Sequence, residues 1–154
     1  MMRIGLIMLL LFGANTCSDF LPRSQSSDLA GKWKIEITFE KQDSRTLSFE
    51  ADESGTGSLK LEGERSNWDE PAKPTKAKWM VESGKQMIII APIEFPIGNV
   101  GREPGILRLK GVFESESRLK GELAFFRMDQ DPMDPNETPS KTGKFHAVRT
   151  DAKN

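Results

Sequence analysis

The feature that most constrains the fold is a strict alternation of apolar and polar residues between Lys32 and Glu40. The odd positions are apolar, and the even positions between them are polar or charged: Trp33, Ile35, Ile37 and Phe39 against Lys34, Glu36 and Thr38. Side chains alternate between the two faces of a β-strand, whereas a helix would scatter these residues around its surface. The stretch is therefore predicted to be a strand with one buried face.

The same alternation recurs along the chain, with turn residues between the segments. It is seen at 47–51, 57–62, 77–81, 87–91, 107–113, 119–125 and 145–149. Beyond the first residues there is no convincing helical pattern. The chain is therefore predicted to be all-β, forming an eight-stranded antiparallel up-and-down barrel. An open sheet or a β-sandwich of the same strands is the alternative.

The predicted connections fall into two sets. Three connections are tight turns, at 52–55, 83–84 and 115–117, whereas three others are long, at 64–76, 92–104 and 127–141. In a meander these sets lie at opposite ends of the barrel. The long connections hold all of the nine prolines except Pro22, and proline restricts the backbone of a loop. One end is thus predicted to be closed by short turns and the other to carry long, stiff loops.

The first residues have the character of an export signal. Arg3 is followed by an apolar run over 4–12 and a small, polar stretch over 13–16. The run is too short to span a bilayer, which needs about 20 apolar residues. We predict a signal segment at 1–17, a flexible tether at 18–29, one barrel domain at 30–150 and a tail at 151–154. The protein would be exported to the cell envelope, periplasmic or at the outer membrane, or secreted.

Cys17, the only cysteine, lies where a bacterial lipoprotein signal places its acylated residue. Residues 11–18 resemble a loose lipobox, although Ala14 replaces the usual leucine and Thr16 the usual glycine or alanine. Two outcomes remain open: lipid attachment at Cys17, which would be the only link to a membrane, or cleavage that releases a soluble protein. Either way the domain has no disulfide and depends on its apolar core.

Several function classes are disfavoured. The formal net charge of −1, with both signs interspersed, argues against a nucleic-acid surface. The only histidine, His146, has outward parity, and no Gly-x-Ser-x-Gly motif occurs, so no enzyme is predicted. The acidic segment from Asp129 to Glu137 lacks the glycine turn and terminal glutamate of an EF-hand, and neither a metal nor a cofactor is predicted.

Gly31 and Trp33 at the start of the first predicted strand, with Arg149 at the end of the last, resemble the lipocalin and wider calycin superfamily. In that family an early Trp packs across the closed end of the barrel, and an Arg from the last strand stacks on it. The resemblance implies that Arg149 stacks on Trp33 as a structural closure, a contact of about 0.5 to 2 kcal/mol. It also implies binding of a small apolar or amphipathic molecule inside the barrel.

The predicted inward side chains define the candidate ligand site. We expect the wall to include Phe49, Leu59, Trp79, Ile89, Leu107, Leu123 and Phe125. An eight-stranded barrel either is filled by its side chains or keeps room for one ligand, and small inward residues such as Gly111 and Ala147 leave both readings open. At the long-loop end, Trp68 and Phe95 are expected to form a lid over the mouth or to plug it.

Two functions follow. The first is an exported, lipocalin-like protein that binds a small apolar or amphipathic ligand in its barrel. The second is a noncatalytic interaction or structural module of the cell envelope, with a filled barrel and an envelope protein as its partner.

Overall fold

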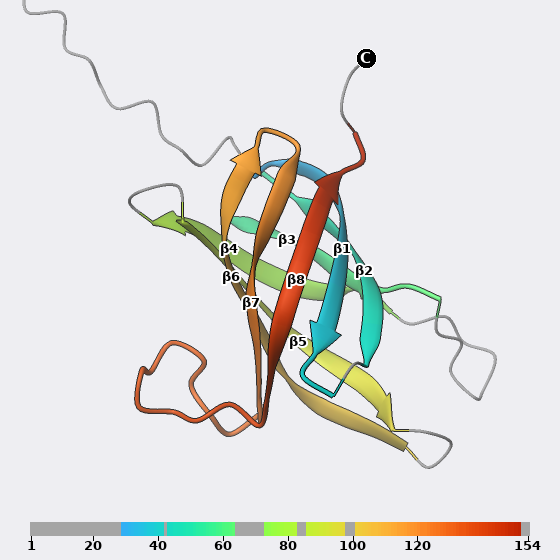
Figure 1. The fold of residues 1–154 in the computed structure, drawn as a ribbon, viewed down its shortest axis with the longest axis vertical. Helices are drawn as coiled ribbons and strands as arrows, with labels where there is room; N and C mark the ends of the chain where they lie inside the picture. Colours follow the sequence, from blue (N-terminus) through green and yellow to red (C-terminus); the bar gives the residue numbers. More distant parts are fainter. Residues whose placement is uncertain (1–28, 42, 64–72, 83–85, 98–100, 152–154) are drawn as a thin grey trace, which may run out of the picture.

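The computed structural model describes residues 29–41, 43–63, 73–82, 86–97 and 101–151. Eight strands form one closed barrel in which each strand pairs with its neighbours in sequence and β1 pairs with β8 (Figure 1). The strands are β1 (Gly31–Phe39), β2 (Ser44–Ala51), β3 (Thr56–Leu61), β4 (Thr75–Glu82), β5 (Gln86–Ile97), β6 (Gly101–Ser115), β7 (Arg118–Phe126) and β8 (Lys141–Arg149). All pairs are antiparallel, so the predicted up-and-down barrel is confirmed, and the open sheet and the sandwich are excluded.

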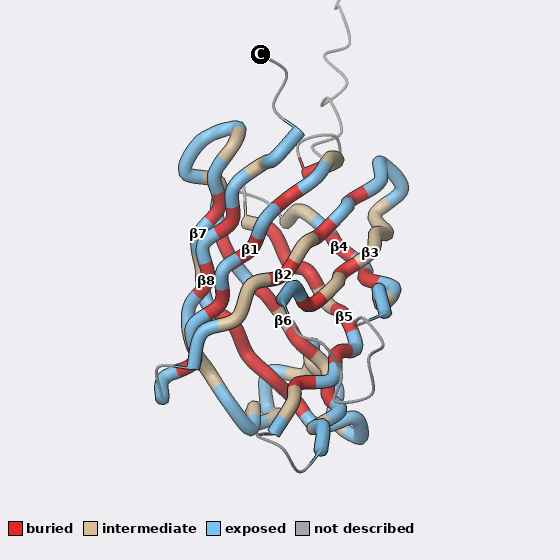
Figure 2. Tube along the Cα trace, turned by 90° about the vertical axis from the view of Figure 1, so that its right-hand side faces the viewer, coloured by how far each residue is buried: buried red, intermediate tan, exposed pale blue. Residues whose placement is uncertain are grey.

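Alternation along each strand gives the barrel its core. In β1 every second residue is buried, and buried and exposed positions alternate along the tube in Figure 2. The register sets inward residues of neighbouring strands side by side, as in Ile37 opposite Phe145. Among the described residues, none that is buried is polar or charged. The interior is therefore one apolar cluster that receives side chains from all eight strands.

The two ends of the barrel differ. One end, which we call the closed end, holds the first residues of β1, the last of β8 and the tight turns after β2 and β6. The other end, which we call the mouth, holds the β1–β2 hairpin, the far ends of β5 and β6, and the loop of residues 127–140 between β7 and β8 (Figure 1). The predicted turn at 83–84 lies outside the described residues.

One predicted loop is wrong. We expected a long connection over 92–104, but β5 continues to Ile97 and β6 begins at Gly101. The two strands pair as far as Ile97 opposite Gly101, beyond the point where β5 leaves β4 and β6 leaves β7. The extension, residues 91–97 and 101–105, is a two-stranded ribbon, which we call the mouth ribbon; it runs past the other strands at the lower right of Figure 1.

The loop was predicted because this segment contains several prolines. Whether a strand tolerates proline, however, depends on where each proline lies in the hydrogen-bond ladder and not on how many there are. Pro92, Pro96 and Pro104 lie in the mouth ribbon. Their register partners are Ile106, Arg102 and Glu94, respectively, and the three prolines face the same side of the ribbon. In an antiparallel ladder every second residue turns its N–H away from a given partner. Among the described strands each ribbon strand has one partner, so a proline at these positions removes no ladder hydrogen bond.

The other two long connections have different outcomes. Residues 127–140 form a loop between β7 and β8, as predicted. Residues 64–72 lie outside the described part of the chain, as do the predicted signal segment, Cys17 and nearly all of the tether. Across the residues that are described, none belongs to a helix with the length and apolarity to cross a membrane.

Candidate functional site

The residues predicted to line a ligand site all lie inside the barrel. Each has at most 4% of its surface exposed, and together they come from six strands: Phe49, Leu59, Trp79, Ile89, Leu107, Leu123 and Phe125. They belong to the single core cluster, so the structure brings the predicted set into one space. Whether that space receives a ligand depends on how the small inward residues are used.

Three of the inward glycines are packed against phenylalanine rings. A Cβ built on Gly57 would lie 2.8 Å from the Phe49 ring, and one built on Gly111 would lie 2.7 Å from the Phe145 ring. A Cβ on Gly105 would overlap the Phe125 ring. Each of these glycines therefore makes room for a side chain of the barrel itself. The sequence left this pairing open, because it depends on which residues the register sets side by side.

The closed end contains the predicted pair. The Arg149 guanidinium lies over the Trp33 ring at 4.5 Å from its centroid, and the two residues are cross-strand partners. Trp33 Nε1 donates a hydrogen bond to the Leu29 carbonyl at 2.8 Å, and Arg149 donates to the Ala30 carbonyl at 2.6 Å. Gly31 has a φ of 130°, which L residues with side chains rarely adopt. The three residues form a structural closure.

A second indole is anchored at the same end. Trp79 Nε1 donates to the carbonyls of Asp52 and Thr56, at 3.1 and 2.9 Å. Asp52 holds the β2–β3 turn by accepting hydrogen bonds from Ser54 and Thr56. The hydroxyls of these two residues lower the pKa of Asp52 to about 2 from its ordinary 3.8. Predicted as part of the ligand wall, Trp79 is thus also tied to the turn.

The mouth is filled by three phenylalanines from three different strands. Phe95 of β5 lies between Phe39 of β1 and Phe125 of β7, with ring centroids 5.4 and 5.3 Å away and edge-on geometry in both contacts. We call these three residues the mouth cluster. Phe95 is 4% exposed, and it belongs to the mouth ribbon. The predicted lid residue is therefore a buried strand residue between rings of the barrel wall, not part of a loop above them.

A charged pair lies beside the mouth cluster. Lys141, the first residue of β8, places Nζ 5.6 Å from the Phe125 ring centroid and 6.0 Å from that of Phe39. It also forms an ion pair with Glu103, which is the register partner of Phe95 in the mouth ribbon. Lys141 has the same parity as Phe145 and Arg149, so β8 carries an inward cation at each of its ends.

Three residues of this site were not predicted from the sequence: Phe39, Lys141 and Glu103. Phe39 was assigned to the inward face but not to the mouth, and neither Lys141 nor Glu103 was selected. Alternation along β8 assigned Arg149 to the inward face. Followed back to Lys141, the first residue of the strand, the same alternation assigns Lys141 to that face as well. Trp68, the other predicted lid residue, lies outside the described residues.

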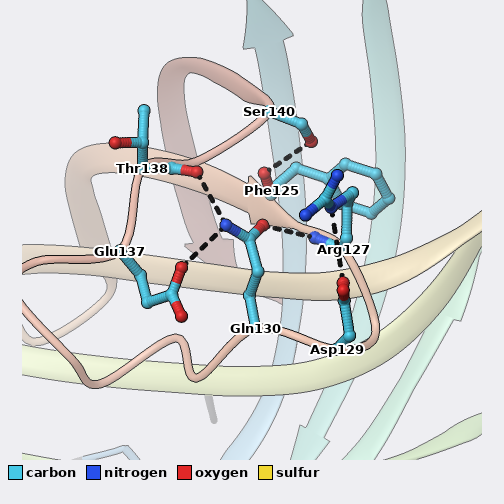
Figure 3. Close-up of polar contacts among 7 residues, drawn as sticks. All are labelled: Phe125, Arg127, Asp129, Gln130, Glu137, Thr138 and Ser140. Carbon is cyan, nitrogen blue, oxygen red and sulfur yellow. Dashed lines mark hydrogen bonds and ion pairs between the residues drawn. The ribbon is translucent and has the colours of Figure 1, made fainter.

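The β7–β8 loop is organised by its own polar groups. Gln130 Nε2 donates to the Glu137 carboxylate at 2.9 Å and to the Thr138 carbonyl at 3.1 Å, while Arg127 pairs with Asp129 (Figure 3). The side chains of Asp131 and Asp134 accept from backbone N–H groups two residues ahead. No group of three or more metal-ligating side chains suited to an ion is found among the described residues.

The same loop covers part of the outer wall. Phe126 points outward yet is fully buried, and Arg108 lies over its ring at 4.9 Å from the centroid. Arg108 also donates a hydrogen bond to the Pro132 carbonyl, which attaches the loop to β6. Four consecutive residues at the end of β7 are therefore buried, where alternation predicts only two.

Among the described residues, open grooves on the outside of the barrel include two that adjoin β1 and β2. The larger, of about 530 Å³, crosses β1, β2 and β3 and is lined mainly by outward polar residues such as Lys34, Ser48 and Lys60. The smaller, of about 330 Å³, lies beside the β1–β2 hairpin. Neither is lined by the mouth cluster, although Phe49 of the predicted ligand wall contributes to the larger one.

Among solved structures the chain is similar to small engineered barrels. One is a redesigned β-barrel with 13% identity, a TM-score of 0.44 and coverage of 80% of this chain and 92% of that one. Another is a redesigned β-barrel, mFAP1, bound to DFHBI, with 9% identity, a TM-score of 0.48 and coverage of 80% and 96%. No protein-family model matches the chain, and no curated protein does. This is a small closed β-barrel, an assignment that rests on its own strand pairing.

Proposed function

We propose that this protein is an exported, noncatalytic, lipocalin-like β-barrel that binds a small apolar or amphipathic molecule in the half of its interior next to the mouth. One observation carries the proposal. The mouth is closed by Phe95, a side chain carried on the mouth ribbon, where each strand has a single partner. A ligand that displaces this one ring gains access to Phe39, Phe125 and the apolar interior behind them.

The physical character of the mouth cluster supports such an exchange. Phe95 meets the rings of Phe39 and Phe125 edge to face, and aromatic pairs of this kind contribute about 0.5 to 1.5 kcal/mol beyond their buried area. Phenylalanine has no hydrogen-bonding group, so its ring leaves no polar atom unpaired when it moves. An apolar ligand restores the same kind of contact, and its burial contributes about 25 cal/mol for each Å² removed from water.

The depth of the site is limited by the other half of the barrel. Toward the closed end, Trp33 and Trp79 are fixed by hydrogen bonds, and the Phe145 ring occupies the space above Gly111. Displacing an anchored indole would break those bonds. The ligand is therefore expected beside Ile93, Leu107 and Phe125, and not beside Trp33.

A second function is favoured by a specific observation, the packing of Phe49, Phe125 and Phe145 against Gly57, Gly105 and Gly111, respectively. Under this alternative the barrel stays filled and is a noncatalytic module whose outer surface contacts another protein of the cell envelope. The two functions make opposite predictions about what the purified protein carries.

The test is the intact mass of the full chain purified from its own host, recorded under native and then denaturing conditions. We expect a noncovalent adduct that is lost on denaturation. Phe95→Ala should raise the fraction that carries the adduct, because it removes the ring that occupies the site. Phe113→Ala is the matched control, since Phe113 makes its ring contact with Trp33 at the closed end. A bare barrel in all three proteins would overturn the proposal and favour the filled module.

The same spectra test export. A mass that begins at Cys17 and includes acyl chains indicates a lipoprotein, whereas an unmodified mass from which the signal segment is missing indicates a released protein. Retention of residues 1–16 in protein from the host would contradict export.

A further inference from the structure

We propose that the mouth selects ligands with an apolar body and an anionic head group, that Lys141 binds this head group, and that the Glu103 carboxylate occupies the same position in the ligand-free protein. The inference rests on the proposed function, since it names the chemical class of the ligand. It is carried by the position of one inward ion pair beside the mouth cluster.

Lys141 is placed to contact both parts of such a ligand. Its Nζ lies within 6.0 Å of the Phe39 and Phe125 ring centroids, which are the rings that Phe95 separates. A molecule that takes the place of Phe95 therefore lies next to this ammonium group. Its side chain is 43% exposed, so it reaches water on one side and the aromatic rings on the other. An ammonium group at such a boundary favours an anion whose apolar body is buried.

Glu103 shows where that anion would lie. It is the register partner of Phe95, so the ring that fills the mouth and the carboxylate that pairs with Lys141 belong to the same level of the mouth ribbon. Together the two side chains form an apolar group with a carboxylate beside it. A ligand of the same chemistry replaces both contacts at once, whereas a neutral ligand replaces only the ring.

Other charges near the mouth have different surroundings. Arg102 and Glu94 pair with each other on the outer face of the ribbon, and Arg45 pairs with Asp43 at the β1–β2 hairpin. Lys141 lies over two rings of the mouth cluster, those of Phe39 and Phe125. An anionic head group attached to an apolar body that takes the place of Phe95 is therefore expected at Lys141.

The test uses two fluorescent probes that differ only in the anion. The neutral probe is N-phenyl-1-naphthylamine, and the anionic probe is its sulfonate, 1-anilinonaphthalene-8-sulfonate. Both are titrated into the full mature chain at low and high salt. We expect the sulfonate to bind more tightly at low salt and to lose affinity as salt rises, while the affinity of the neutral probe changes little.

Two substitutions test the assigned roles. Lys141→Gln should weaken sulfonate binding about two- to fivefold, the range for a partly exposed ion pair, and leave the neutral probe unchanged. Glu103→Gln should strengthen sulfonate binding by a similar factor, because it removes the competing carboxylate. Lys120→Gln is the matched control, since Lys120 forms an ion pair with Glu114 away from the mouth. Urea unfolding of each variant verifies that the probes report a folded barrel.

The outcomes separate this inference from the proposed function. If both probes bind with equal affinity and Lys141→Gln changes neither, the barrel holds a ligand and the anion selectivity is wrong. If neither probe binds to the folded protein, both the inference and the proposed function are contradicted. If Lys141→Gln fails to fold, the Glu103→Gln variant provides the test. An affinity for the sulfonate that is unchanged or lower in that variant overturns the assignment of Glu103 as the competing carboxylate.

Discussion

The two ends of this barrel are closed by different chemistry, although β8 supplies an inward cation to each. At the closed end, Arg149 lies over Trp33, and both side chains donate hydrogen bonds to backbone carbonyls of residues 29–30. At the mouth, Lys141 lies beside Phe39 and Phe125, and its ion-pair partner is another side chain.

The difference shows how one architecture combines a fixed end with an adaptable one. A hydrogen bond to the backbone fixes the direction of an indole, and breaking it leaves a buried donor unpaired. Edge-to-face ring contacts tolerate other partners of similar shape. Trp33 is therefore expected to resist displacement, whereas Phe95 is the side chain that the proposed ligand would replace.

The largest difference in stability is expected between two single variants, each of which lacks one aromatic ring at one end of the barrel. Trp33→Ala is expected to lower the free energy of unfolding by about 3 to 5 kcal/mol, because it opens a cavity and removes a hydrogen bond. Phe95→Ala should cost less than about 3 kcal/mol, since the mouth ribbon can move into the space. Urea unfolding measures both. Equal losses would contradict the distinction between the two ends.

Glycines give a second comparison. A Cβ on Gly121 would overlap the backbone of Lys110 and Gly111, whereas a Cβ on Gly101, at the tip of the mouth ribbon, would have no atom of the described residues within 4 Å. Gly121→Ala is therefore expected to cost about 1 to 3 kcal/mol or more through overpacking. Gly101→Ala should change stability by less than about 0.5 kcal/mol. Chemical denaturation of the two variants side by side checks the contrast, which fails if Gly121→Ala is also tolerated.

The two cations of β8 should also differ. Arg149→Met is expected to cost about 1 to 2 kcal/mol, because it removes both the stacking on Trp33 and the hydrogen bond to Ala30. Lys141→Met should cost at most about 1 kcal/mol, as expected for a partly exposed ion pair. Thermal and urea unfolding report the difference, and a larger loss at Lys141 would reverse the comparison.

The smallest expected effect is a pH dependence at the closed end. Hydrogen bonds from the Ser54 and Thr56 hydroxyls hold the pKa of Asp52 near 2, below its ordinary 3.8. The ionised carboxylate therefore stabilises the folded state above about pH 4, and this contribution is lost as the pH falls toward 2. Asp52→Asn should flatten the fall in stability over that interval, measured by urea unfolding at several pH values. A slope identical to that of the parent protein would show that the turn does not depend on this charge.

Much of the fold was predictable because period-two alternation is a local property. Trp33, Ile35 and Ile37 mark an inward face without reference to any other strand, and repeating that pattern gives eight strands. The pair formed by Arg149 and Trp33 was predicted by parity together with a family resemblance. The seven residues of the predicted ligand wall are likewise inside the barrel.

The mouth was harder to predict, because its features depend on where strands lose their neighbours. Pro92, Pro96 and Pro104 indicated a loop, yet they are compatible with strands that have a single partner, and strand length relative to a neighbour is not a local property. Phe126 shows the same limit, since it is buried on the outer face by a loop attached through Arg108 and Pro132.

By itself the sequence determined the strand count, the inward faces and the closed end, because alternation and turn residues act over a few neighbouring positions. The tertiary structure alone decided that three inward glycines are packed against phenylalanine rings, that Phe95 lies between Phe39 and Phe125, and that Lys141 meets Glu103. Each of these contacts joins residues from different strands, and their meeting depends on the register and closure of the whole barrel.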